Sequence, residues 1–72
     1  MHYYHLKNLF KSIVKQLDNK DADSTTRQHN LTALFHLRLS VNAIHMDLKD
    51  KGINEPILVE LSKEINDKYN SY

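Results

Sequence analysis

The sequence predicts an all-α protein, in which an antiparallel helical hairpin follows an additional N-terminal amphipathic helix. Apolar residues recur at helical spacing in three separate segments, and no segment shows the alternating pattern of a strand. The single glycine, Gly52, and the single proline, Pro56, are close together, so both helix-breaking residues mark the same turn. We therefore expect one domain of 72 residues with helices over about residues 5–18, 25–51 and 55–70.

The first helix has one apolar side and one basic side. Its apolar residues follow the i, i+3, i+4, i+7 spacing of a helix and are Leu6, Leu9, Phe10, Ile13, Val14 and Leu17. Lys7, Lys11 and Lys15 repeat every four residues on the other side. This pattern indicates a core side and a hydrated side. An alternative is that the lysine row contacts an acidic partner.

The second helix is expected to begin after the polar segment 18–24 and to end at Gly52. Thr25 and Gln28 have the spacing of a capping box, with Ser24 as a close competitor for the N-cap position. Gly52 suits the helix end because a residue without a Cβ enters the left-handed conformation at little cost.

Two apolar stripes run along this helix, separated by a polar row. The first stripe is Leu34, Leu37, Val41, Ile44 and Leu48; the second is Leu31, Phe35, Leu39 and Met46; the polar row is Arg38, Asn42, His45 and Lys49. Two stripes predict two packing partners. We expect the third helix to cover one stripe, and the first helix or a second copy of the chain to cover the other. The first stripe is our candidate for the core or for self-association into a homodimer.

The third helix restarts almost at once after the glycine. Asn54 is the expected N-cap, and Pro56 fits the first turn, where its missing N–H would be unpaired in any case. The expected core stripe is Leu58, Leu61, Ile65, Tyr69 and Tyr72. Because the connection is so short, the second and third helices should be antiparallel.

The composition argues against several classes of protein. A net charge of +1 does not fit a dedicated nucleic-acid binder. There is no apolar run of the roughly 20 residues that a membrane-spanning helix needs, and the first residues, including His2, do not resemble a secretory signal. With no cysteine in the sequence, these features favour a cytoplasmic location.

Residues for an independent active site are also missing. The five histidines lack i, i+4 spacing, and no H-E-x-x-H motif occurs, so we expect no bound metal. One glycine cannot build a phosphate-binding loop or a nucleophile elbow. We therefore expect no cofactor, and the sequence favours a function based on binding.

Residues 52–66 resemble part of the Spo0E-like family, the small sporulation-control aspartyl-phosphate phosphatases. Gly52, Glu55 and Pro56 match the family's turn, and Ser62-Lys63-Glu64-Ile65-Asn66 occupies the place of its Ser-Gln-Glu-Leu-Asp signature. The resemblance implies a helical hairpin that binds a phosphorylated bacterial response regulator in sporulation regulation. The family's catalytic aspartate corresponds to Asn66, which has no charge and cannot act as a base.

The resemblance therefore implies either an aspartyl-phosphate phosphatase that lacks its signature aspartate or a non-catalytic response regulator binding protein. The residues expected to contact the regulator are Val59, Ser62, Lys63, Asn66 and Asn70. One alternative is a non-enzymatic dimeric scaffold or adaptor in a bacterial or phage assembly. A third interpretation is a DNA-binding regulator with a basic edge made by the lysine row and Arg27.

Overall fold

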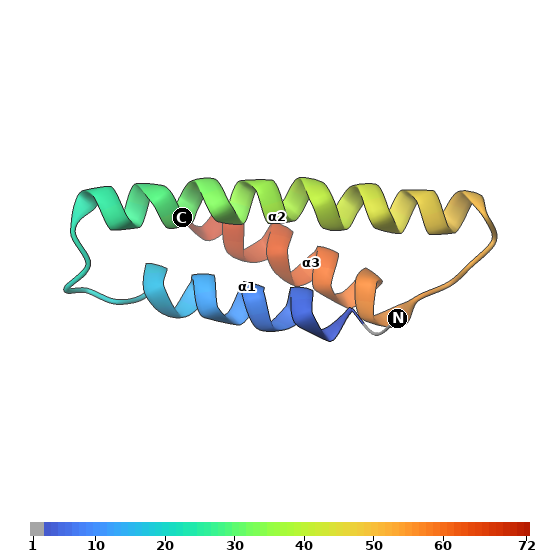
Figure 1. Cartoon of the computed structure of the whole chain (residues 1–72), viewed down its shortest axis with the longest axis horizontal. Coiled ribbons are helices and arrows are strands. Elements are labelled where there is room, and N and C mark those ends of the chain that lie inside the picture. Colours follow the sequence, from blue (N-terminus) through green and yellow to red (C-terminus); the bar gives the residue numbers. More distant parts are fainter. Residues whose placement is uncertain (1–2) are drawn as a thin grey trace.

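A computed structural model describes residues 3–72 and contains three helices over that range. They are α1 (Tyr4–Leu17), α2 (Ser24–Asp50) and α3 (Pro56–Ser71), so each helix end lies one residue from its expected position. Figure 1 shows α1 and α3 both running antiparallel to the longer α2, in a molecule of 44 × 17 × 16 Å. The prediction of an all-α fold with a helical hairpin after an additional helix is confirmed. His2 lies outside the described residues.

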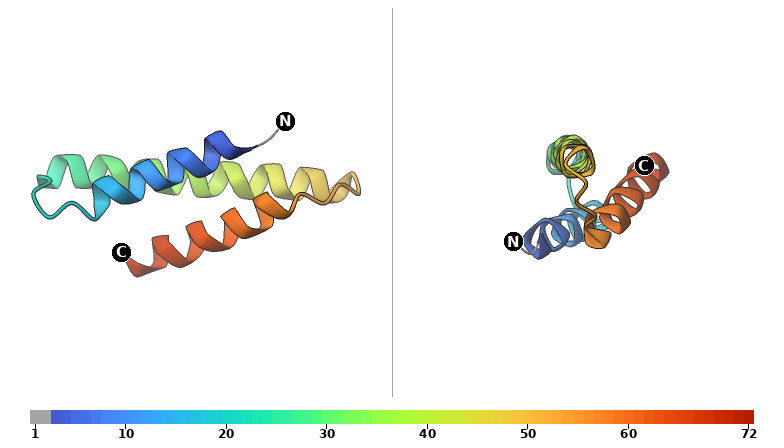
Figure 2. Two further views of the ribbon diagram at one scale, coloured as in Figure 1. Left: turned by 90° about the horizontal axis from the view of Figure 1, so that it is seen from below. Right: turned by 90° about the vertical axis from the view of Figure 1, so that its right-hand side faces the viewer.

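All three helices contribute to one hydrophobic core. In the end-on view of Figure 2 they occupy the corners of a triangle, and α2 packs against both α1 and α3. The buried apolar residues are Phe10, Ile13 and Leu17 of α1, Leu34, Leu37 and Val41 of α2, and Leu58, Leu61 and Ile65 of α3. Ile44 and Leu48 of the first stripe, together with Leu31 and Tyr69, are partly buried against this core. The first stripe of α2 is therefore a core stripe.

The expectation that α1 covers the second stripe of α2 is wrong. Leu39 and Met46 remain 51% and 54% exposed, and Phe35 is 38% exposed beside the Tyr69 ring of α3. The physical reason is that three helices around one common core each direct a single sector inward, so α1 and α3 share the first stripe. Most of the second stripe is left without cover from residues 3–72 of its own chain.

The N-cap of α2 is Asp23, and the expected capping box of Thr25 and Gln28 is wrong. The backbone of Asp23 is extended, and its carboxylate accepts a hydrogen bond of 2.7 Å from the Thr26 backbone N–H. A carboxylate at this position also lies near the positive end of the helix dipole. Asp23 therefore caps the helix more favourably than the neighbouring hydroxyl groups.

Asp23→Ala is expected to lower the melting temperature at pH 7. The hydrogen bond from the Thr26 backbone N–H lowers the pKa of Asp23 below its ordinary value of 3.8. A lowered pKa in the folded state stabilises the protein above the ordinary pKa, and this stabilisation is lost as the pH falls through the lowered value. The difference between wild type and variant in thermal melts should thus shrink below about pH 3.8. Asp21→Ala is the matched control, and an equal effect of both variants would contradict the capping role.

The turn between α2 and α3 is built around Gly52. Its φ angle is +75°, its N–H donates to the Lys49 carbonyl (3.0 Å), and the Ile53 N–H donates to the Leu48 carbonyl (2.9 Å). These are the two hydrogen bonds of a Schellman motif. The prediction that Gly52 ends the helix is confirmed.

The expected N-cap of α3, Asn54, is wrong by one residue. Pro56 occupies the first position of α3, and the preceding Glu55 is the N-cap with an extended backbone and no side-chain capping bond. Proline sterically disfavours a helical conformation at the residue before it. Pro56 therefore sets the start of α3 more strongly than the capping preference of Asn54.

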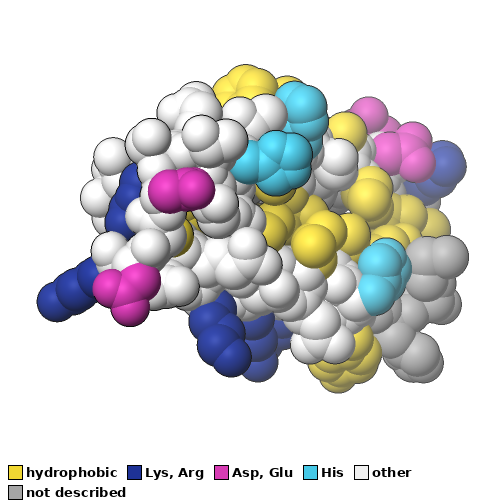
Figure 3. Space-filling view, turned by 60° about the vertical axis from the view of Figure 1, so that its left-hand side comes forward, with side chains coloured by type: hydrophobic (Ala, Val, Ile, Leu, Met, Phe, Trp, Pro, Cys, Tyr) yellow, Lys and Arg dark blue, Asp and Glu magenta, His cyan; other side chains and the backbone are white. Residues whose placement is uncertain are grey.

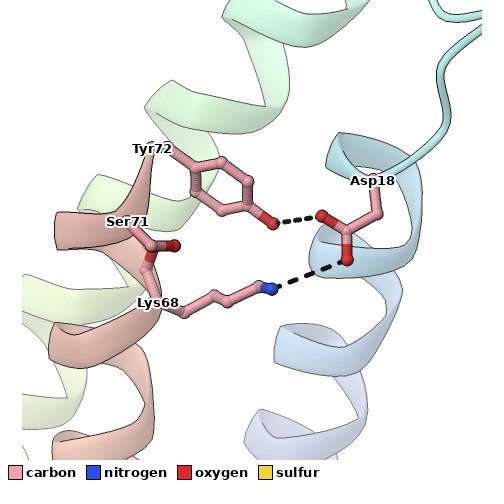
Figure 4. Close-up of polar contacts among 4 residues, drawn as sticks. All are labelled: Asp18, Lys68, Ser71 and Tyr72. Atoms are coloured by element: carbon pink, nitrogen blue, oxygen red, sulfur yellow. Dashed lines mark hydrogen bonds and ion pairs between the residues drawn. The ribbon is translucent and has the colours of Figure 1, made fainter.

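Because α1 and α3 are parallel, their C-terminal ends lie together. There the Tyr72 hydroxyl donates to Asp18 Oδ1 (2.8 Å), and Lys68 Nζ lies 3.6 Å from Asp18 Oδ2 (Figure 4). The Ser71 hydroxyl, also shown there, donates to the Lys68 carbonyl. Burial, and then the hydrogen bond to Asp18, raise the pKa of Tyr72 to about 12, so the phenol stays protonated and donates. These contacts connect two helices that otherwise touch less than either touches α2.

Candidate partner-binding face

A row of polar contacts joins α2 to α3. The Ser62 hydroxyl donates to Asn42 Oδ1 (2.5 Å), and Arg38 Nε donates to Asn66 Oδ1 (2.7 Å); both bonds are partly buried. From Ser62 to Asn66 the chain advances four residues along α3, and their partners on α2 lie four residues apart in the opposite direction, as regular antiparallel packing requires. We call Arg38, Asn42, Ser62 and Asn66 the polar seam.

The sequence placed Ser62 and Asn66 among the residues that contact a partner, whereas both hydrogen bond to α2. The sequence predicts the polar row of α2 and, separately, the residues of α3 that contact a partner. Their pairing was missed, because helical spacing does not show which neighbour a row will meet. One signal was available: in both rows the paired residues are four apart, Arg38 with Asn42 and Ser62 with Asn66.

The other three residues expected to contact a partner lie on the outer edge of α3. Val59 is 45% exposed, and Lys63 and Asn70 are exposed as well. At about 100° per residue, these three lie just beyond Ser62 and Asn66 around the helix. The same spacing places Leu39 and Met46 just beyond Arg38 and Asn42 on α2. The polar seam and its borders therefore form one surface, the hairpin face: Arg38, Leu39, Asn42, Met46, Val59, Ser62, Lys63, Asn66 and Asn70.

Charge is divided between the two sides of α3. Glu64 and Asp67 face the groove toward α1, which Lys11 and Lys15 line from the opposite side. The hairpin face contains Arg38 and Lys63 and no acidic residue. Lys11 and Lys15 thus line a groove together with carboxylates of their own chain. Neither Arg38 nor Lys63 takes part in an ion pair within residues 3–72.

The polar groups of the hairpin face are amides, one hydroxyl and two cations. Asn66 directs its side-chain oxygen to Arg38, and its amide is not a base. Among residues 3–72 there is also no cluster of three or more His, Asp or Glu side chains that could hold a metal ion. The arrangement can bind through hydrogen-bond donors, positive charge and apolar contact.

A separate groove of about 790 Å³ lies between α1 and α2. Leu6, Leu9 and Leu37 contribute apolar surface, and His29 and His36 border it from α2. Figure 3 shows apolar side chains in this groove, with histidine side chains beside them. The two histidines are seven residues apart on one helix, about 10 Å along its axis, too far to share a ligand atom.

Comparisons with known proteins do not assign the chain to a family. Neither the protein-family models, nor the curated proteins, nor the solved structures include a match to this sequence. Within residues 3–72, none of the helices has both the length and the apolar character of a membrane-spanning segment.

Proposed function

We propose that this protein is a small helical regulator that binds a phosphorylated bacterial response regulator through its hairpin face, without dephosphorylating it. The observation that carries the proposal is the composition of that face. It combines exposed apolar side chains, Leu39, Met46 and Val59, with the cationic Arg38 and Lys63 and no carboxylate. Apolar contact next to positive charge is complementary to a protein surface that carries a phosphoryl group.

The state of Asn66 favours binding over catalysis. A phosphatase of the Spo0E-like kind would need its signature aspartate, and the amide that replaces it already accepts a hydrogen bond from Arg38. The bound protein would act by occlusion: it covers the phosphorylated aspartate of the regulator and blocks access to it. This proposal draws on the resemblance of residues 52–66 and on the charge of the hairpin face.

The test is the affinity for a sporulation-type response regulator, measured with and without its phosphoryl group. Lys63→Glu should weaken binding to the phosphorylated form by about tenfold or more. It replaces a cation at the rim of the interface by a carboxylate, which has the same sign of charge as the phosphoryl group. Lys15→Glu, on α1, is the matched control and should leave the affinity unchanged. Circular dichroism should show the same helix content for all three proteins. Equal affinity of wild type and Lys63→Glu would show that the regulator does not contact the hairpin face at Lys63 and would contradict the proposed binding surface.

Loss of label from the phosphorylated regulator should be measured in parallel. With the wild-type protein the label should be lost no faster than from the regulator alone. Faster loss would contradict the non-catalytic proposal and favour the phosphatase interpretation, and Asn66→Asp should then increase the rate further.

A second candidate is a non-enzymatic dimeric scaffold or adaptor in a bacterial or phage assembly. It is favoured by the exposure of Leu39 and Met46, which form part of an apolar stripe that lacks cover from residues 3–72. Sedimentation equilibrium distinguishes the two: a stable homodimer without affinity for any response regulator would support the scaffold. A DNA-binding role is less favoured, since Lys11 and Lys15 face acidic residues across the α1–α3 groove.

A further inference from the structure

We infer that Arg38 anchors an oxyanion-binding site on the hairpin face, which takes a phosphoryl or carboxylate group of the partner through the terminal nitrogens of its guanidinium. The inference deepens the proposed function, because it names the chemical group that the face binds. The oxyanion site itself can be tested without the regulator.

The guanidinium of Arg38 is held in place by its neighbours. Its Nε donates to Asn66 Oδ1 (2.7 Å), and its Cζ lies 5.3 Å from the centre of the Tyr69 ring. Tyr69 in turn lies beside Phe35, with 5.9 Å between ring centres. The hydrogen bond and the stacking contact restrict the side chain before any ligand arrives, so less conformational entropy is lost on binding.

This positioned cation has no acidic partner in the described part of the chain. The ion pairs within residues 3–72 are Lys51 with Asp47 and Lys68 with Asp18, and neither involves Arg38. The terminal nitrogens of Arg38 donate no hydrogen bond to residues 3–72. Arg38 is half-buried, which reduces the screening of its charge by water. An arginine fork in this state is suited to bidentate binding of a carboxylate or phosphoryl group.

The hydrogen bonds of the polar seam also leave donors rather than acceptors for a ligand. Because arginine can only donate, Asn66 must direct its oxygen to Arg38, and its NH₂ group remains for other contacts. Asn42 likewise uses its oxygen to accept from Ser62. The internal bonds thus occupy both amide oxygens, while the terminal nitrogens of Arg38 and the two amide NH₂ groups have no acceptor within residues 3–72. A cluster of donors around a cation is complementary to a ligand rich in acceptors, which is an oxyanion.

The direct test is an NMR titration that follows the side-chain N–H signals of arginine and asparagine. Inorganic phosphate and acetate are the probes, and sodium chloride at the same ionic strength is the control. We expect saturable shifts of the Arg38 and Asn66 signals with phosphate or acetate, and none with chloride. Arg27, a half-buried arginine on the same helix, is the internal control and should not shift. Equal shifts at Arg27, or equal shifts with chloride, would overturn the inference.

Arg38→Lys tests the geometry of the fork, since it keeps the charge but loses the paired donors. It should abolish the phosphate-dependent shift of Asn66, and a thermal melt should establish that the variant folds. Tyr69→Phe keeps the ring beneath the guanidinium and should retain the shift. A saturable Asn66 shift that persists in Arg38→Lys would overturn the role of Arg38.

Binding to the response regulator identifies the source of the oxyanion. If the ligand is the phosphoryl group, Arg38→Lys should weaken binding to the phosphorylated regulator about tenfold and change binding to the unphosphorylated form little. If the ligand is a carboxylate of the regulator, both forms should lose affinity equally. Regulator binding that is unchanged in Arg38→Lys, with no phosphate shift, would overturn the inference and leave the proposed function intact. Phosphate shifts in a protein that does not bind the regulator would support the oxyanion site and overturn the proposed function.

Discussion

Leu34→Ala is expected to destabilise the protein by about 2–5 kcal/mol, the usual cost of removing a fully buried leucine side chain. Leu34 is 0% exposed and lies in the core that all three helices share. At roughly 0.05–0.15 kcal/mol per residue, 72 residues correspond to a free energy of unfolding of only about 4–11 kcal/mol. The loss therefore removes a large part of the free energy of unfolding.

Urea or thermal unfolding followed by circular dichroism measures this effect. Leu39→Ala is the matched control, because it makes the same change on the same helix at a side chain that is 51% exposed. Its effect should stay within about 0.5 kcal/mol, as is usual for surface substitutions. If both variants lost equal stability, and the loss at Leu39 grew with protein concentration, Leu39 would be buried in a homodimer.

Ile65→Asp is expected to unfold the protein at neutral pH. Ile65 is 0% exposed, and among residues 3–72 its neighbours in the core are apolar. An ionised carboxylate without a partner is very costly at such a site, and burial raises its pKa above the ordinary value of about 3.9 for aspartate. The penalty is largest above the raised pKa, and it decreases as the pH falls and the carboxyl group takes up a proton.

Helix content measured from pH 7 to about pH 4 checks this prediction. The Ile65→Asp variant should regain helical signal on acidification, relative to the wild type at the same pH. In Ile65→Asn the side chain has nearly the same shape as aspartate but cannot titrate, so the destabilisation of this variant should not follow the same pH dependence. A wild-type melting temperature for Ile65→Asp at pH 7 would show that this position is not buried.

Local chemistry explains why the helices and their turn could be predicted. The apolar spacing of α1, the left-handed conformation of Gly52 and the position of Pro56 depend on residues within one or two turns of each other. The N-caps of α2 and α3 were predicted less well. Several residues with capping side chains stand next to each other at 23–25, and Pro56 sets the start of α3 by its effect on Glu55.

The candidate site was predictable only in part. Val59, Lys63 and Asn70 were expected on one exposed edge of the third helix, and the structure leaves them exposed. Ser62 and Asn66 were expected on the same edge, but the structure pairs them with Asn42 and Arg38. These residues are 20 and 28 positions apart along the chain, too far for helical periodicity to relate them.

The three helices, the turn at Gly52 and the residues that share a side of each helix could all be predicted from the order of amino acids. Helix packing, in contrast, establishes that α1 and α3 share one stripe of α2, that Leu39 and Met46 remain exposed, and that Arg38 is held by Asn66 and Tyr69. The physical reason is that helical spacing sets the direction of each side chain around its own axis, whereas the packing of the helices sets what lies in that direction.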